Sequence, residues 1–237
     1  MKIIEVERDE YDEKNLAKFS NPDDHYYEGI RTKSMMWRWI ARLSMQPATV
    51  QLILDTTVDI ILEKDLELKK VAAAEKQKAL REMLKKNFFD HNAALHQEIA
   101  DLIPQNSSVL DIGAGIGCLK DVLDARGKTV DYHAQDISRR FLELNPAEDD
   151  KRYCCDLRVL PAAVGHRRFD VVVDCRASHY LAYDGSRYPE QFLEFAALGK
   201  MYIYASAVAL PDGMTLAFDA ARKITELHVL EDKKKRP

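Results

Sequence analysis

The segment from Val109 to Leu119 constrains the fold of this chain more than any other. An apolar strand sequence runs directly into three alternate glycines, Gly113, Gly115 and Gly117, before a helical sequence begins. Glycine has no Cβ and reaches positive φ without strain, so this spacing predicts a sharp strand-to-helix turn whose backbone can approach a ligand. The amides that open the following helix would face the same ligand. The segment therefore predicts a nucleotide-binding turn after a buried strand.

The glycine spacing distinguishes two kinds of nucleotide-binding turn. Dinucleotide folds use G-x-G-x-x-G/A, with the third small residue three places after the second. Here the spacing is G-x-G-x-G with Asp111 in front, and Cys118 stands where that third small residue belongs. The segment resembles motif I of the class I S-adenosylmethionine (SAM) methyltransferases. Alone it is a weak signal, because tight turns also use glycine for purely structural reasons.

Two later segments have the order that this resemblance implies. Residues 130–138 predict a second strand ending in Asp136, and a carboxylate there can accept hydrogen bonds from both ribose hydroxyls of a cofactor. Residues 153–157 resemble the short third strand of the family, whose terminal acid lies near the adenine. This nominates Asp156, with Leu157 as an apolar wall.

Residues 168–181 resemble the fourth strand and its following loop, where the family has cofactor and substrate contacts. The resemblance covers about residues 88 to 210, and it implies SAM as the cofactor. The residues that it nominates for cofactor binding are Asp111, Gly113, Ala114, Gly115, Gly117, Asp136, Ile137, Asp156, Leu157, Asp174 and Cys175.

The predicted fold is α/β, with a doubly wound, mainly parallel, seven-stranded Rossmann-like sheet and an N-terminal helical cap. Helical sequences over 88–103 and 189–198 lead into the first strand and into a fifth strand over 200–210. Only residues 214–230 remain for the last two strands of the family, and 224–230 is the best strand candidate. The sheet is therefore either trimmed at its end or closed by a compact hairpin.

Three domains are expected: a helical cap or lid extension over 1–86, the SAM-binding domain over 87–231 and a basic tail over 232–237. Helical spacing with few breakers marks 33–43 and 50–86. These helices either pack as a cap on the sheet or form the contact of a homodimer.

Residues 21–43 are rich in side chains that bind ligands. In similar enzymes an N-terminal helical segment closes over cofactor and substrate, because methyl transfer benefits from excluding water. The segment is therefore predicted to belong to a lid, and the alternative is that its tryptophans and methionines pack between helices. The lid candidates for substrate contact are His25, Tyr26, Tyr27 and Arg31.

Methyl transfer is an in-line displacement, and a general base is needed only where the acceptor must lose a proton. His179 is the first candidate for this base, since it follows the fourth strand by a few residues, and His25 of the predicted lid is the other candidate. The alternative for His179 is that it packs or orients the substrate. Tyr180 and Tyr183 lie beside it, and Arg176 could neutralise an acidic substrate or the methionine carboxylate. Asp111 is expected to order the glycine turn and to reach the cofactor's amino group, or to be a structural cap only.

Composition fits an enzyme of this kind. The chain has 237 residues, 46% of them hydrophobic, which suffice for one good core. It has no signal-peptide pattern and no apolar run of membrane-spanning length, so a cytoplasmic location without membrane contact is expected. The four cysteines lack zinc-site spacing and the seven histidines are scattered, so no metal site is expected.

The formal net charge of −4 argues against general affinity for nucleic acid. The preferred function is SAM-dependent methyl transfer to a small-molecule acceptor, such as a metabolite or a biosynthetic intermediate. Two alternatives stay open. One is an RNA or protein methyltransferase, and the other is a catalytically silent SAM-binding subunit of a partner enzyme.

Overall fold

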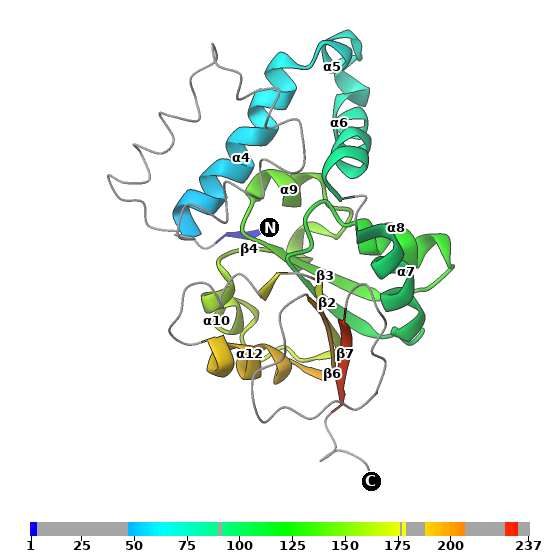
Figure 1. The fold of residues 1–237 in the computed structure, drawn as a ribbon, viewed down its shortest axis with the longest axis vertical. Helices are drawn as coiled ribbons and strands as arrows, with labels where there is room; N and C mark the ends of the chain where they lie inside the picture. Colours follow the sequence, from blue (N-terminus) through cyan, green and yellow to red (C-terminus); the bar gives the residue numbers. More distant parts are fainter. Residues whose placement is uncertain (4–46, 90–91, 176, 179–187, 207–225, 232–237) are drawn as a thin grey trace.

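The computed structural model describes residues 1–3, 47–89, 92–175, 177–178, 188–206 and 226–231. Seven strands form one sheet in the order β1-β4-β3-β2-β5-β6-β7 (Figure 1). Every neighbouring pair is parallel except β6 and β7, which are antiparallel. The prediction of a mainly parallel, doubly wound α/β sheet is confirmed.

The strands are β1 (Lys2–Ile3), β2 (Ser108–Ile112), β3 (Asp131–Asp136), β4 (Arg152–Cys154), β5 (Phe169–Cys175), β6 (Gly199–Ser206) and β7 (Glu226–Glu231). The α-helices are α4 (Pro47–Lys64), α5 (Leu66–Lys70), α6 (Lys76–Leu84), α7 (Ala93–Leu102), α8 (Cys118–Ala125), α9 (Arg139–Leu144), α10 (Leu160–Val164) and α12 (Tyr188–Ala196). Shorter turns are η1 (Ala73–Glu75), the π-helical η2 (Lys85–Phe89), η4 (Asp149–Lys151) and η5 (Leu157–Val159).

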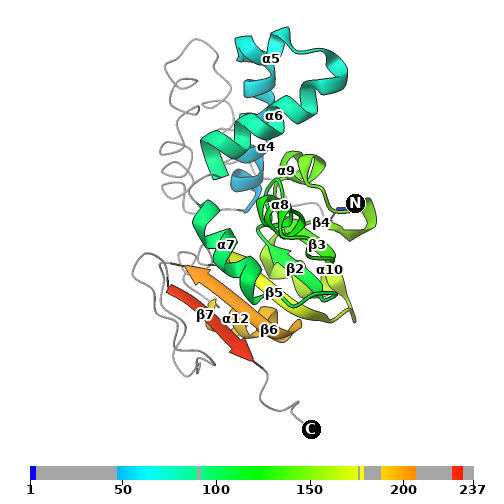
Figure 2. The same ribbon diagram turned by 90° about the vertical axis from the view of Figure 1, so that its right-hand side faces the viewer.

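The central strands are apolar on both faces because helices cover both faces of the sheet (Figure 2). Val109 of β2 packs in a cluster with Ile99 of α7 and Leu123 of α8. The next residue, Leu110, faces the other side and packs in a cluster with Leu160 of α10. Continuous apolar runs in β2 and β5 are therefore what a doubly covered parallel sheet requires.

The strand order reverses beside β2, and this reversal positions the candidate site. From β2 the chain continues to β3 and β4 on one side, and then crosses to β5 and β6 on the other. Ligands of open α/β sheets bind at such a switch point, outside the carboxyl ends of the strands. The glycines follow β2 directly, so they lie at this point of the sheet.

The end of the sheet was expected either to be trimmed or to close with a compact hairpin, and residues 207–225, which would decide between these, lie outside the described residues. Among the described residues one strand, β7, follows β6, and it overlaps the predicted strand region 224–230 in all but its last residue. The seventh strand is instead β1, whose two residues pair with β4 at the opposite edge.

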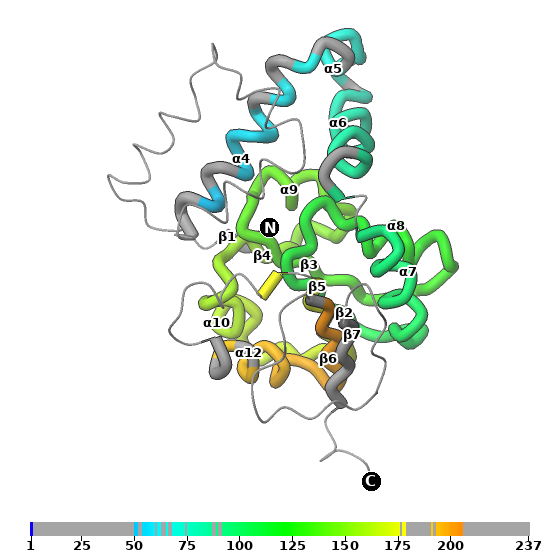
Figure 3. Tube along the Cα trace, viewed as in Figure 1, coloured from blue at the N-terminus to red at the C-terminus, as the bar shows by residue number. Residues whose placement is uncertain are grey.

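Helices α4, α5 and α6, here called the cap, stand beyond the α9 side of the sheet (Figure 3). Their apolar residues pack within the chain against Ile116 of the glycine turn, Cys118 of α8 and Phe141 of α9. The contributing cap residues are Leu54, Val58, Ile61, Leu68, Leu80 and Leu84. The amphipathic pattern of 50–86 is explained by this packing, and a homodimer contact through these helices stays a prediction. None of the described helices has the length and apolar character needed to cross a bilayer.

Candidate functional site

The glycine turn, residues 113–117, joins the end of β2 to the start of α8. Gly113, Gly115 and Gly117 have φ values of +64°, +52° and +81°, a region that other L-residues adopt only with strain. A Cβ at Gly113 would lie 2.4 Å from the Cβ of Ala177, and one at Gly115 would lie 2.7 Å from the ring of Phe89. The glycines therefore serve the close packing of the turn as well as its conformation.

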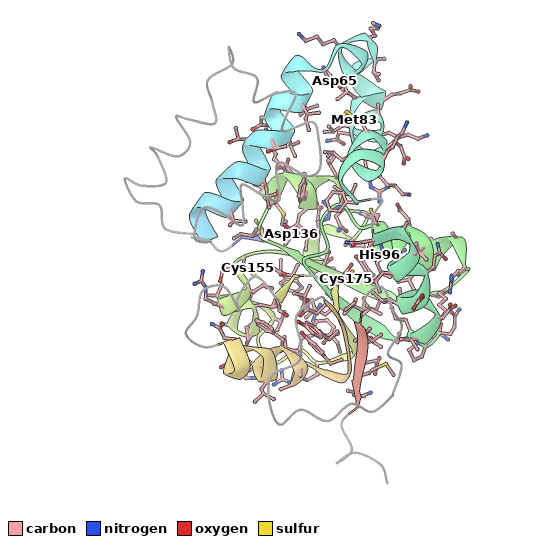
Figure 4. All side chains as sticks on the ribbon, viewed as in Figure 1. Asp65, Met83, His96, Asp136, Cys155 and Cys175 are labelled. Carbon is pink, nitrogen blue, oxygen red and sulfur yellow. The ribbon has the colours of Figure 1, made fainter. Side chains whose placement is uncertain are left out.

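Asp136, at the end of β3, faces the glycine turn. Its Oδ2 accepts a hydrogen bond from the Gly115 amide at 2.9 Å, and its Oδ1 accepts one from the Ser138 amide at 2.8 Å. The side chain is only 7% exposed, and burial raises the pKa of its carboxyl to about 6. The Ile137 amide gives Asp136 a third backbone hydrogen bond, and a carboxylate has about four acceptor sites, so Asp136 keeps capacity for one further donor beside the turn. Figure 4 labels Asp136 at this place, below the cap residues Asp65 and Met83.

Asp111, near the end of β2, is also buried. It accepts a hydrogen bond from the Tyr132 hydroxyl at 2.5 Å. Burial raises the pKa of Asp111 to about 7, and the nearby charges of Asp136 and Asp174 act in the same direction. A positive ligand close to Asp111 would favour its ionised form.

Asp174, near the end of β5, supports the turn that follows this strand. Its Oδ1 accepts hydrogen bonds from the amides of Ala177 and Ser178 at 3.1 and 3.0 Å, and its Oδ2 accepts one from the Tyr202 hydroxyl at 2.6 Å. The side chain is fully buried, and Cys175 beside it is 9% exposed. Asp174 therefore orders the backbone next to the glycine turn, and a direct contact with the cofactor stays a prediction for both residues.

Of the other residues nominated for cofactor binding, Ile137 follows β3, and Asp156 and Leu157, which were nominated for the adenine side, follow β4. The carbonyl of Ile137 accepts a hydrogen bond from the Gln51 side-chain amide at 3.1 Å. Asp156 forms an ion pair with Arg158 at 2.8 Å and also accepts its backbone amide, while Leu157 packs on the cluster formed by α10 and α12. Contacts of these residues with a cofactor likewise stay predictions.

Two supports of the glycine turn were not predicted from the sequence. Gln135 accepts the Gly113 amide on its Oε1 at 3.0 Å and donates from its Nε2 to the carbonyl of Cys155 at 2.7 Å. Asn145 donates to the carbonyl of Gly115 at 3.0 Å. A glutamine inside a buried strand was a usable signal for Gln135, because buried polar side chains need partners. Asn145 follows a short helix and carries no comparable signal.

A cap residue, Arg81 of α6, also holds the turn. It donates to the carbonyl of Ile116 at 3.0 and 3.2 Å and to the carbonyl of Leu144 at 3.0 Å. The same guanidinium forms an ion pair with Asp121 of α8 at 2.9 Å, and Lys85 pairs with the other oxygen of that carboxylate. Asp121 therefore pairs with both Arg81 and Lys85 beside the turn.

The electrostatics of the site follow from three buried carboxylates. Asp111, Asp136 and Asp174 lie at the carboxyl ends of the neighbouring strands β2, β3 and β5. Within the described residues their recorded partners are backbone amides and tyrosine hydroxyls. Such a site favours a ligand with positive charge over one with phosphates. Within those residues, no three histidine, cysteine or acidic side chains are grouped so as to hold a metal ion.

The remaining nominated side chains lie outside the described residues. They are His25, Tyr26, Tyr27, Arg31, Arg176, His179, Tyr180 and Tyr183.

Residues 110–198 match the sequence model of a protein family described as "Methyltransferase domain". Among solved structures, the chain is similar to a SAM-dependent methyltransferase from Bacteroides fragilis in complex with S-adenosyl-L-homocysteine, with 20% identity, a TM-score of 0.37 and coverage of 48% of this chain and 47% of that one. It is similar to DesVI of Streptomyces venezuelae, with 22% identity, a TM-score of 0.38 and coverage of 58% and 61%. It is also similar to a SAM-dependent methyltransferase from Geobacter sulfurreducens, with 16% identity, a TM-score of 0.36 and coverage of 49% and 47%.

These overlays are partial, and the matched part spans about half of the length of the Bacteroides and Geobacter proteins. No curated protein matches the chain by sequence. The matched residues 110–198 begin inside β2 and end directly before β6, so they include the glycine turn and the acids at the ends of β3 and β5.

Proposed function

We propose that this chain, which carries a class I SAM-dependent methyltransferase domain, transfers a methyl group from SAM to a small-molecule acceptor. The domain assignment rests on residues 110–198, and SAM is the cofactor of this family. The observation that carries the proposal is the group of buried carboxylates beside the glycine turn, Asp111, Asp136 and Asp174.

The charges of SAM fit this donor set. SAM carries a sulfonium, an ammonium and a carboxylate group and no phosphate, so it brings a net positive charge to buried carboxylates whose partners among the described residues are backbone amides and tyrosine hydroxyls. Asp136 keeps acceptor capacity for a ribose hydroxyl while it holds the amides of Gly115, Ile137 and Ser138. A dinucleotide would instead place its pyrophosphate at the glycine turn, where the buried carboxylates Asp111 and Asp174 lie nearby and disfavour negative charge.

The bound cofactor would supply a methyl group made electrophilic by the positively charged sulfur. The chain's own task is then to hold, orient and shield the reactants, and this task can supply much of the acceleration of an in-line displacement. Asp136 and the amides of the glycine turn orient the cofactor side. We propose His179 as the base for acceptors that must lose a proton, and full turnover by His179→Ala with the true acceptor would remove it from the mechanism.

The proposed acceptor class rests on charge. A net charge of −4 and a carboxylate-lined site give little support for binding a phosphate backbone. We therefore propose a small acceptor, a metabolite or a biosynthetic intermediate, reached beneath a lid formed by residues 21–43. A cytoplasmic location belongs to the same proposal.

Calorimetry with SAM and with NAD tests the premise: SAM should bind and NAD should not. A methyl-donor assay on pools of metabolites, RNA and proteins then identifies the acceptor class. Methylation confined to the RNA or protein pool would contradict the small-molecule proposal. Binding of SAM without turnover in all three pools would instead indicate a silent subunit, and binding of NAD alone would contradict the cofactor assignment.

The affinity for SAM should depend on pH through Asp111. Because the cation favours the ionised carboxylate, SAM binding weakens as Asp111 takes up a proton below its pKa of about 7. The Kd is expected to rise about tenfold between pH 8 and pH 6 from this group alone. In Asp111→Asn, measured by the same calorimetric titration, the part of the pH dependence of the Kd that comes from this carboxyl should disappear. The titration of SAM itself is common to both proteins, so the difference between them isolates Asp111.

The stability of the ligand-free protein should depend on pH in the opposite direction and should fall as the pH rises. A buried acid whose pKa is raised stabilises the fold only while it is protonated, so the contribution of Asp111 is lost as the pH rises from about 4 to about 7. Asp111→Asn keeps an acceptor for the Tyr132 hydroxyl and removes the buried charge. At pH 8 the ligand-free variant should therefore melt at a higher temperature than the wild type, although it binds SAM more weakly. A lower melting temperature together with an unchanged pH slope would contradict this account.

A further inference from the structure

The loop between β3 and α9 is held from outside the sheet by helix α4. Asp55 Oδ1 accepts hydrogen bonds from the Ser138 hydroxyl at 2.6 Å and from the Arg140 amide at 3.1 Å. One turn earlier on α4, the Gln51 side chain donates to the carbonyl of Ile137 at 3.1 Å. Residues four apart on a helix share one face, so a single polar edge of α4 binds this loop.

Ser138 connects this contact to the cofactor side of the loop. Its hydroxyl donates to Asp55, while its backbone amide donates to Asp136 Oδ1 at 2.8 Å. The other oxygen of Asp136 accepts the Gly115 amide at 2.9 Å. Ser138 is fully buried and Asp136 nearly so, and water therefore cannot readily replace a lost bond at either residue. An unbroken path of hydrogen bonds leads from α4 through Ser138 and Asp136 to the glycine turn.

The start of α9 depends on the same two side chains. The Arg140 amide donates to Asp55, and the Phe141 amide donates to the Ser138 hydroxyl oxygen at 3.1 Å. The first amides of a helix have no partner within the helix, so Asp55 and Ser138 satisfy two groups that would otherwise be unpaired. Loss of Asp55 would release both the Ser138 hydroxyl and the first turn of α9, which together fix the loop.

We propose that Asp55 is a positioning residue for cofactor binding, which acts through Ser138 to fix the orientation of Asp136 and the position of the Gly115 amide. The inference rests on the proposed function, because SAM is the ligand whose binding it explains. Asp55 acts only through other residues. A shift of about 1 Å in a group that orients a ligand is enough to weaken its action strongly.

Asp59 provides a matched control on the same helix. It lies one turn beyond Asp55 and also contacts α9, through an ion pair with Arg140 Nη2 at 2.7 Å. That pair joins two side chains that are 41% and 50% exposed, and such pairs contribute little to stability. Asp59 has no recorded bond to residues 137–138. Its replacement removes an acidic contact between α4 and α9 but leaves the path to Asp136 intact.

The experiment measures SAM affinity by calorimetry for the wild type, Asp55→Ala, Asp55→Asn and Asp59→Ala, under conditions in which circular dichroism shows each to be folded. Asp55→Ala should weaken SAM binding by about tenfold or more, the usual consequence of losing hydrogen bonds to a charged group. Asp55→Asn keeps an oxygen acceptor for Ser138 and Arg140, so its Kd for SAM should lie within about threefold of the wild-type value. Asp59→Ala should stay within about twofold.

A second measurement does not depend on SAM. Hydrogen exchange of the Gly115 amide in the ligand-free protein reports directly on its bond to Asp136. It should be about tenfold faster in Asp55→Ala and unchanged in Asp59→Ala. If the wild type does not bind SAM, the proposed function fails, and this exchange rate still decides whether the path exists.

Three outcomes would overturn the inference. The first is wild-type SAM affinity in folded Asp55→Ala. The second is an equal loss in Asp55→Ala and Asp59→Ala, which would indicate general loosening of the cap. The third outcome concerns Ser138→Ala, which is measured if Asp55→Ala does not fold. This variant breaks the same path but keeps the backbone amide of residue 138 bound to Asp136. Unchanged SAM affinity and unchanged Gly115 exchange in that variant would also show that the path has no effect.

Discussion

Asp136→Asn is expected to weaken SAM binding by about a hundredfold or more. Both oxygens of Asp136 accept backbone amides, one from Gly115 and one from Ser138. Asparagine has a single oxygen, so in either orientation its amide nitrogen opposes one of these N–H groups. The site is buried, and an unsatisfied buried donor costs about 1–3 kcal/mol. The variant also loses the negative charge that favours a cationic ligand, and together these effects amount to about two powers of ten in Kd.

Asp170→Asn is the matched control for this prediction. Asp170 Oδ2 accepts the amide and the hydroxyl of Ser108 at 2.9 and 3.0 Å, and its Oδ1 pairs with Lys200. It therefore joins the amino ends of β5 and β2, whereas the glycine turn lies at the carboxyl ends of the strands. The pairing and hydrogen bonds lower the pKa of Asp170 to about 2, so its replacement should reduce the melting temperature at neutral pH. Calorimetry should give an unchanged SAM Kd for this variant, and a comparable loss in both variants would contradict a specific role for Asp136.

The strands were predictable because their signals are local. β5 is an apolar run within the expected segment 168–181, and β3 ends at Asp136 as the sequence indicated. The position of Asp136 at the glycine turn also followed, since the ends of neighbouring parallel strands meet at one edge of a sheet.

The supports of the site were not predictable because their partners are distant along the chain. Arg81 binds a carbonyl 35 residues away, and Gln51 binds one 86 residues away. Helical periodicity identifies the face of a helix that will be buried, but not the polar groups that lie beyond it. The pairing of β1 with β4 is similar, because two residues are too short a strand to give a periodic signal.

The roles of the individual buried acids could not be predicted from the sequence either. Asp111, Asp136 and Asp174 look alike as acids near strand ends, yet their partners differ. Asp174 holds the turn after β5, Asp136 holds the glycine turn, and Asp111 has the Tyr132 hydroxyl as its recorded partner. Burial and partners therefore give three aspartates different tasks, and these depend on tertiary packing rather than on spacing.

Gly113→Ala is expected to weaken SAM binding by about a hundredfold or more. Two effects combine at this position. The residue has φ of +64°, where a side chain costs about 1–2 kcal/mol, and its new Cβ would lie 2.4 Å from the Cβ of Ala177. Neither methyl group can rotate away from the other, so the glycine turn or the turn after β5 must move. Because Asp174 holds the second turn, the displacement falls on the site itself.

Gly127→Ala separates the clash from the strain. Gly127 has nearly the same φ, +65°, but a Cβ there would meet nothing within 4 Å. It should lower the melting temperature by the conformational cost alone and leave the SAM Kd unchanged. The double variant Gly113→Ala/Ala177→Gly removes the opposing Cβ and should recover part of the affinity, to a level set by the remaining strain. If Gly127→Ala weakened SAM binding as much as Gly113→Ala, or if the double variant recovered nothing, the close approach of Gly113 to Ala177 would not be the cause of the loss.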